Sequence, residues 1–200
     1  MYPLLGLSLA AIAVIIERLL AYRTIAHEAP GLLHEIVELC RADQFERALQ
    51  QAEGQNGPVA SCIATVLRHR HQAVEDVERN VQEVGETYFI ELERRLPLLD
   101  TTTTISPLLG LLGTLFGMIG TFQQIAASKS QGATDSILSG VGEALYATAT
   151  GLTIAVVCFV AYNYFAARSR AVSSETEQSA TKLINVLREL QRLGASAPES

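Results

Sequence analysis

The sequence predicts an all-α membrane protein with three transmembrane helices and long cytoplasmic helical extensions. Three separate apolar runs carry this prediction, because a helix that crosses a bilayer needs about 20 apolar residues. The polar stretches between them repeat their apolar residues at helical spacing, and no strand pattern rises above background. We expect a first transmembrane helix in residues 1–23, a cytoplasmic helical region in 24–95, a second transmembrane helix in 96–126, an outer loop in 127–140, a third transmembrane helix in 141–167, and a cytoplasmic C-terminal helix and tail in 168–200.

The first apolar run, PLLGLSLAAIAVIIERLLAY, starts at Pro3. Its uninterrupted part is short before Glu17 and Arg18, so the core of a signal peptide is an alternative. In a signal peptide, however, the positive charge precedes the apolar run, whereas here it follows. No small-residue cleavage site is apparent either, and the pattern therefore favours a membrane span.

Basic residues beside the three runs predict the orientation. Cytoplasmic flanks of membrane helices are enriched in lysine and arginine. A pair of arginines follows the first run, precedes the second and follows the third: Arg18 with Arg23, Arg94 with Arg95, and Arg168 with Arg170. The outer loop offers only Lys129 against Asp135. All three pairs are cytoplasmic at once if the N-terminus and the loop lie outside and the C-terminus inside.

The cytoplasmic region reads as helices. Apolar residues in LLHEIVELCRADQFERALQQAE follow helical spacing, and GQNGP (54–58) is a strong break. No proline interrupts the chain from Pro58 to the second span, which predicts one long helix running into that span. After the third span, SSETEQSATKLINVLRELQRL has an apolar stripe that must be buried against a partner segment or a neighbouring subunit. The tail GASAPES is expected to be disordered.

Several functional classes lack support. The formal net charge of −6 leaves no basic surface for nucleic acid. The three cysteines form no CxxC pair and no metal set with histidine, so we expect no metal, no cofactor and no disulfide framework. The sequence shows no nucleophile–base pair, so an enzyme is not supported either. A substrate transporter is disfavoured because internal repeats and interrupted membrane helices are missing.

The second span contains SPLLGLLGTLFGMIG, with four glycines at near-helical spacing. A phosphate-binding glycine loop follows a strand and lies in water, so this run is not one. In a membrane helix, small residues allow a second helix to approach closely. The glycines therefore predict tight helix packing.

Two threonines interrupt these small-residue faces. Residues at i, i+4, i+7 and i+11 share one face of a helix. These faces comprise Gly110, Thr114, Gly117 and Thr121 in the second span, and Ala144, Thr148, Gly151 or Leu152, and Ala155 in the third. Thr114 lies about as far before the outer loop as Thr148 lies after it, so the hydroxyls should sit at similar depth. They either line a narrow pore or grip a central helix, or they only bond to their own i−4 carbonyls.

A threonine hydroxyl does not titrate near neutral pH, so it cannot by itself carry a proton. The only carboxylate well inside a predicted span is Glu143, on a face shared with Ala147 and Thr150. Ionisable residues inside a membrane are functional candidates, although one so near the interface is also compatible with simple solvation. The central acid of a proton path is therefore expected to come from a partner.

The run SPLLGLLGTLFGMIGTF followed by ILSGVGEALYATATGLTIAVVCFVAYN resembles the MotA/TolQ/ExbB proton-channel family over residues 105–163. Three spans with a large loop after the first resemble the ExbB/TolQ branch, and ExbB most. The resemblance implies a homopentameric ring in the bacterial inner membrane, with a periplasmic N-terminus and outer loop. The ring would enclose two helices of an ExbD/TolR-like single-span protein bearing a membrane aspartate. Proton flow would then energise a TonB- or TolA-like protein.

The resemblance also implies residue roles. Thr114 matches the pore threonine of GLLGT, Glu143 the glutamate of EAL, and Thr148 the threonine five positions later. Val157 stands where the family usually has a proline, which puts a kink there in doubt. Pro107 lies inside the second span, where the hydroxyls of Thr101–Thr104 either re-satisfy nearby carbonyls or line the exit of the proton.

Two functions follow. The leading one is a proton-channel subunit of a motor complex, with Thr114, Thr148 and Glu143 on the proton pathway. Gly110, Gly117, Thr121, Ala144 and Ala155 would contact the partner's helices. The alternative is a passive membrane scaffold whose small-residue faces only hold partner helices, with lipid around both.

Overall fold

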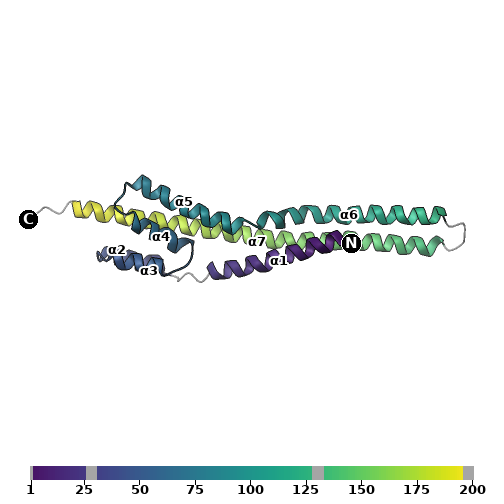
Figure 1. The fold of residues 1–200 in the computed structure, drawn as a ribbon, viewed down its shortest axis with the longest axis horizontal. Helices are drawn as coiled ribbons and strands as arrows, with labels where there is room; N and C mark the ends of the chain where they lie inside the picture. The colour runs from purple at the N-terminus through teal and green to yellow at the C-terminus, as the bar shows by residue number, and fades with distance from the viewer. Residues whose placement is uncertain (1, 26–30, 128–132, 196–200) are drawn as a thin grey trace, which may run out of the picture. The chain divides into compact units, whose positions relative to one another are not determined.

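The computed structural model describes residues 2–25, 31–127 and 133–195, and these residues are helical with short turns and no strand. In chain order, and labelled as in Figure 1, the helices are α1 (Tyr2–Ile25), α2 (Leu32–Arg41), α3 (Phe45–Glu53), α4 (Pro58–Arg68), α5 (Val74–Glu93), α6 (Leu96–Ala127) and α7 (Ala133–Ala195). The chain divides into two compact units, residues 1–18 with 95–166 and residues 19–94 with 167–200.

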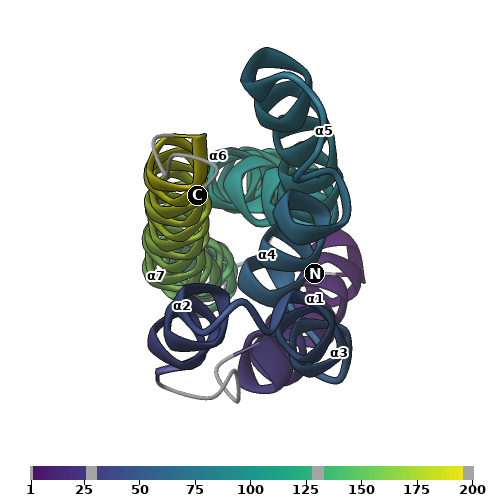
Figure 2. The ribbon, with the colours of Figure 1, turned by 90° about the vertical axis from the view of Figure 1, so that its left-hand side faces the viewer.

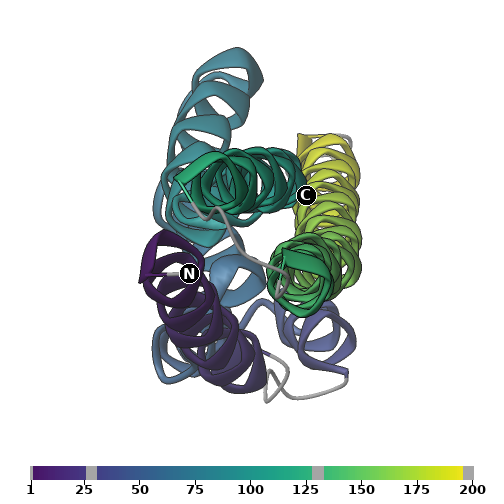
Figure 3. The ribbon, with the colours of Figure 1, turned by 90° about the vertical axis from the view of Figure 1, so that its right-hand side faces the viewer.

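The first unit contains the start of α1, all of α6 and the first part of α7 (Figure 3). Three helical stretches are long and apolar enough to cross a membrane, within Pro3–Arg23, Val74–Ala126 and Leu138–Leu190. This confirms the three predicted apolar helices. Large apolar side chains such as Leu108, Phe116 and Val156 are more than half exposed in this unit. In water such exposure is costly, whereas in a bilayer these side chains contact acyl chains.

One face of α1 packs inside the first unit. Leu4, Ala11 and Val14 are buried at positions that share a side of the helix. At the end of this face, Glu17 forms ion pairs with its neighbour Arg18 and with Arg95, which directly precedes α6. The pair with Arg95 links two residues 78 positions apart in the sequence. Two of the arginines predicted to flank the spans, Arg18 and Arg95, are therefore also structural contacts.

The second unit is a helical bundle around α4. Figure 2 shows α4 between the α2–α3 pair and α5, with the end of α7 alongside. Pro58 and every residue from Cys62 to Leu67 are buried, because helices cover α4 on several sides. The C-terminal stripe joins this core through Ala180, Leu183, Ile184 and Leu187. The sequence left two options for burying that stripe, a partner segment or a neighbouring subunit. In the structure the stripe packs against a segment of the same chain.

The prediction of one long helix from Pro58 into the second span is wrong. Helix α4 ends at Arg68, α5 begins at Val74 and ends at Glu93, and α6 begins at Leu96. The turn after α4 is held by backbone bonds, including Gln72 N–H to the His69 carbonyl at 2.9 Å. No proline or glycine marks this turn. The break arises because α5 packs back against α4, and such tertiary packing overrides local helix propensity.

Helix α7 is longer than the predicted third span. It begins at Ala133, inside the predicted outer loop, and continues without interruption through Val157 to Ala195. Without the family proline, every backbone N–H near Val157 remains available to the helix. Gly194 and Ala195, the first two residues of the predicted disordered tail, belong to this helix. Residues 128–132 of the predicted loop and 196–200 of the predicted tail lie outside the described residues.

Candidate functional site

The candidate site lies where α6 and α7 cross at close range in the first unit. Glycines make this approach possible: a Cβ on Gly113 would lie 2.9 Å from the Ala147 Cβ, and one on Gly117 would lie 3.0 Å from the Ala144 Cβ. A Cβ on Gly110 would lie 3.0 Å from both the Ala147 carbonyl oxygen and the Thr148 Cα. The glycine run of the second span is thus a packing face, as its spacing predicts.

Thr114 and Thr148 meet at the centre of this crossing. Their Oγ1 atoms lie within hydrogen-bond distance of each other, although 34 residues separate them in sequence. The Thr148 Oγ1 lies 3.1 Å from the Gly110 carbonyl oxygen. The Thr114 Oγ1 lies 3.2 Å from the same carbonyl and 3.4 Å from that of Ala144. The two hydroxyls, which the sequence places at similar depth, are therefore in direct contact.

This cluster has more acceptors than protons. Each hydroxyl carries one proton and accepts others on its lone pairs. Either Thr148 donates to Thr114, which donates to a carbonyl, or Thr114 donates to Thr148, which donates to Gly110. The pair thus has two hydrogen-bond orders that interconvert by rotation of the two hydroxyls. Such a group polarises and orients a neighbouring water or acid without itself being ionised.

The residues predicted to contact a partner's helix have contacts within this chain. Gly110, Gly117 and Ala144 lie in the α6–α7 contact, and the Thr121 hydroxyl donates to the Gly117 carbonyl at 2.9 Å while its side chain packs on Gly140. Ala155 is buried. The approach that the small residues permit is, in this structure, that of α7 to α6. Their contact with a partner's helix stays a prediction.

Glu143 does not join the threonine pair. It is exposed on α7, next to the buried Ala144. Five residues separate it from Thr148, which corresponds to about 140° around a helix. The role of Glu143 on a proton pathway stays a prediction.

The hydroxyls near Pro107 make local bonds. Each of Thr101–Thr104 donates to the carbonyl four residues earlier, at distances from 2.7 to 3.3 Å. The sequence leaves two roles open for these hydroxyls, bonding to nearby carbonyls or lining the exit of the proton. The observed bonds agree with the first role.

Ser106 is a site residue that the sequence reasoning missed. Its side chain is fully buried, and among the described residues its Oγ has no hydrogen-bond partner. Ser106 lies four residues before Gly110, so it extends the stripe of Gly110 and Thr114 toward the N-terminal end of α6. Continuing the i, i+4 count backwards by one step would have included it.

Comparison with known proteins gives a consistent family. The family model described as the MotA/TolQ/ExbB proton channel family matches residues 42–178, more than half of the chain. An ExbB-like biopolymer transport protein of Synechocystis is 29% identical over 164 residues, covering 82% of this chain and 78% of the relative. The biopolymer transport protein ExbB of Xanthomonas campestris is 30% identical, covering 67% of this chain and 49% of the relative.

A Tol-Pal system protein TolQ of Pseudomonas aeruginosa is 42% identical over 79 residues, which are 40% of this chain and 34% of the relative. The matched region of the family model contains both threonines, Glu143 and the glycine face. With three long apolar helices and these relatives, the chain belongs to the ExbB/TolQ branch of the MotA/TolQ/ExbB proton channel family.

Proposed function

We propose that this chain is the proton-channel subunit of an inner-membrane complex that uses the proton motive force to energise TonB- or Tol-type transport across the cell envelope. The observation that carries the proposal is the contact between Thr114 and Thr148 on facing membrane helices. Membership of a proton-channel family and relatives named ExbB and TolQ support the same conclusion.

The threonine pair supplies hydrogen bonds, and a partner supplies the titrating group. An ExbD/TolR-like single-span protein with an aspartate in its membrane helix fits this division, because neither threonine ionises. When that carboxylate takes or releases a proton, its demand for donors and acceptors changes. The two hydrogen-bond orders of the threonine pair accommodate both states. Glu143, toward the outer end of the third span, serves as a further carboxylate on the pathway.

In this proposal, five copies of the chain form a ring around two partner helices, with lipid outside. Exposed apolar side chains on the spans support the lipid contact. The N-terminus and the 127–140 loop are periplasmic, and the second unit and the C-terminus are cytoplasmic, on the positions of the arginine pairs. Native mass measurement of the complex tests the ring, and a dimer or trimer would contradict it.

The decisive experiment removes one hydroxyl without changing side-chain shape much. Thr148→Val should leave the complex assembled but lower proton flux into proteoliposomes by about tenfold or more, the effect of one lost hydrogen bond of about 1.4 kcal/mol in the conducting state. Thr148→Ser keeps the hydroxyl and should retain flux. A pH-sensitive dye trapped in the vesicles reports the flux under an imposed potential.

Two threonines of the same helix serve as matched controls. The Thr150 and Thr153 hydroxyls donate to their own i−4 carbonyls, at 2.7 and 2.8 Å. Their valine variants should conduct normally.

A passive scaffold is the second candidate, favoured by one observation: the small-residue faces are occupied by α6–α7 packing within the chain. In a scaffold the threonine pair only holds these helices together. Thr148→Val would then assemble, and vesicles with this variant, the controls and the unmodified chain would show the same proton flux; that result would reject a proton path through Thr148.

A further inference from the structure

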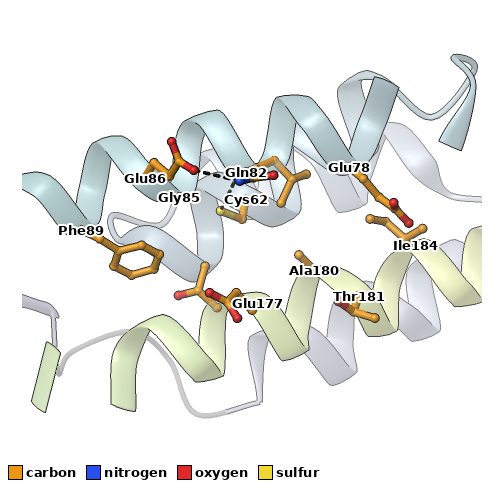
Figure 4. A pocket seen from close by; sticks show the side chains of 12 residues that line it. Cys62, Glu78, Gln82, Gly85, Glu86, Phe89, Glu177, Ala180, Thr181 and Ile184 are labelled. Carbon is orange, nitrogen blue, oxygen red and sulfur yellow. Dashed lines mark hydrogen bonds between the residues drawn. The ribbon is translucent and has the colours of Figure 1, made fainter. Parts of the chain in front are cut away.

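The second unit contains a groove that the proton pathway does not use. It runs between α5 and α7, with Cys62 of α4 at its base, and has a volume of about 440 Å³ (Figure 4). Its lining residues are Cys62, Glu78, Val81, Gln82, Gly85, Glu86, Phe89, Thr176, Glu177, Ala180, Thr181 and Ile184. On α5 they recur every three or four residues, so one continuous face of the helix borders the groove.

The floor of the groove is apolar and is kept open by a glycine. A Cβ on Gly85 would meet only the Phe89 ring edge at 3.4 Å and the Cys62 Sγ at 3.9 Å, both ordinary contacts. Ala180 and Ile184 of α7 are buried along the opposite wall. An apolar side chain entering from outside would therefore be covered by apolar atoms on both walls.

The rim of the groove is acidic. All charged side chains among its described lining residues are carboxylates, those of Glu78, Glu86 and Glu177. Arg188 approaches Glu78 from beyond the groove at 3.9 Å. Glu86 accepts a hydrogen bond from the neutral side chain of Gln82 at 2.8 Å, and Glu177 accepts one from that of Ser173 at 3.3 Å. The rim thus keeps negative charge that a cationic ligand would complement.

We propose that this groove binds a basic segment of the single-span partner, on the cytoplasmic side of that partner's membrane helix. An acidic rim over an apolar floor fits a peptide that presents lysine or arginine around one apolar side chain. A protein with a single transmembrane helix has one of its chain ends on the cytoplasmic side, where the proposed topology places the second unit. This inference rests on the proposed function for the existence of that partner.

Site-specific cross-linking in the full-length complex tests the proposal. A photoreactive maleimide on Gln82→Cys, in a Cys62→Ala background and with the ExbD/TolR-like protein co-expressed, should label the cytoplasmic segment of that protein. Gln82 lines the groove, whereas the neighbouring Glu83 does not. The probe on Glu83→Cys should therefore label the segment much less. Peptide mass spectrometry identifies the labelled residues.

Charge removal provides the second arm. Glu86→Gln with Glu177→Gln should lower the Gln82→Cys cross-link yield by about two- to thirtyfold, the range for two exposed ion pairs. Raising the salt concentration should lower it as well. The matched control, Glu83→Gln with Glu189→Gln, also removes two negative charges, but from residues outside the groove. It should leave the cross-link yield unchanged. Gly85→Leu, which fills the floor, should also abolish the cross-link.

Four outcomes overturn the proposal. A cross-link to a second copy of this chain makes the groove a subunit interface, and a cross-link to lipid makes it a lipid site. If the partner co-purifies but the groove labels nothing, this inference fails while the proposed function stands. If no single-span partner co-purifies with the unmodified chain, both fail.

Discussion

Gly151 is the glycine at which an added methyl group would come closest to a backbone atom of another helix. A Cβ there would lie 2.5 Å from the Ser106 carbonyl oxygen, 3.1 Å from the Gly110 Cα and 3.3 Å from the Gly110 nitrogen. All three neighbours are backbone atoms, which cannot rotate aside as a side chain does. Gly151→Ala therefore requires α6 and α7 to separate locally.

Two opposing effects determine how Gly151→Ala changes the free energy of unfolding. Overpacking a tight contact costs about 1–3 kcal/mol. Replacing glycine by alanine within a helix returns about 0.5–1 kcal/mol. Gly142→Ala, in the same helix, receives only the second term, because nothing lies within 4 Å of its Cβ position. The helix term cancels in the comparison, so Gly151→Ala should be less stable than Gly142→Ala by about 1–3 kcal/mol.

Denaturation of both variants in one detergent, followed by circular dichroism, measures this difference. Gly120→Ala is a second control on α6, again with open space at the Cβ position. Separation of the helices should also part Thr114 from Thr148 and lower proton flux. Equal stability of Gly151→Ala and Gly142→Ala would refute the close α6–α7 packing.

Two predictions concern the second unit. Ile63 is fully buried in the core around α4, so Ile63→Ala should lower the free energy of unfolding by about 2–5 kcal/mol; a loss below about 1 kcal/mol in urea denaturation would contradict that core. Burial raises the pKa of the Cys40 thiol to about 11, and the charge of Arg70 only partly offsets this. Alkylation of Cys40 at pH 8 should therefore be slow until the chain is unfolded. Because the folded state holds the thiol proton more tightly, its stabilising contribution is complete below pH 9 and is lost between pH 9 and pH 11; Cys40→Ala should remove this pH dependence.

The turn between α4 and α5 shows why part of the fold was not predictable. Residues 69–73, HRHQA, contain neither proline nor glycine, the residues that most often mark the end of a helix. The chain reverses there because α5 buries Val77 and Gly85 against the core around α4. That gain depends on residues distant in sequence, which no local pattern contains. The same holds for the groove, whose walls come from three helices.

The candidate site was more predictable than the turn, since it depends on helical repeats in two antiparallel helices. Spacing placed Thr114 and Thr148 on small-residue faces, and counting from the short loop placed them at similar depth. Their contact then required only that the two faces meet. Ser106 differs, because its carbonyl oxygen lies against Gly151 of α7, and this close approach depends on how the two helices pack.

By itself the sequence determined the membrane class, the three apolar helices, the stripe on each of two spans and the family, because these depend on local composition and on the 3.6-residue period. Only the tertiary structure decided what covers each stripe. It placed α7 on the glycines of α6, and it placed the core around α4 on the C-terminal stripe. The physical reason is that a periodic face specifies that something must pack there, whereas its partner is selected by the fit and free energy of contacts between distant segments.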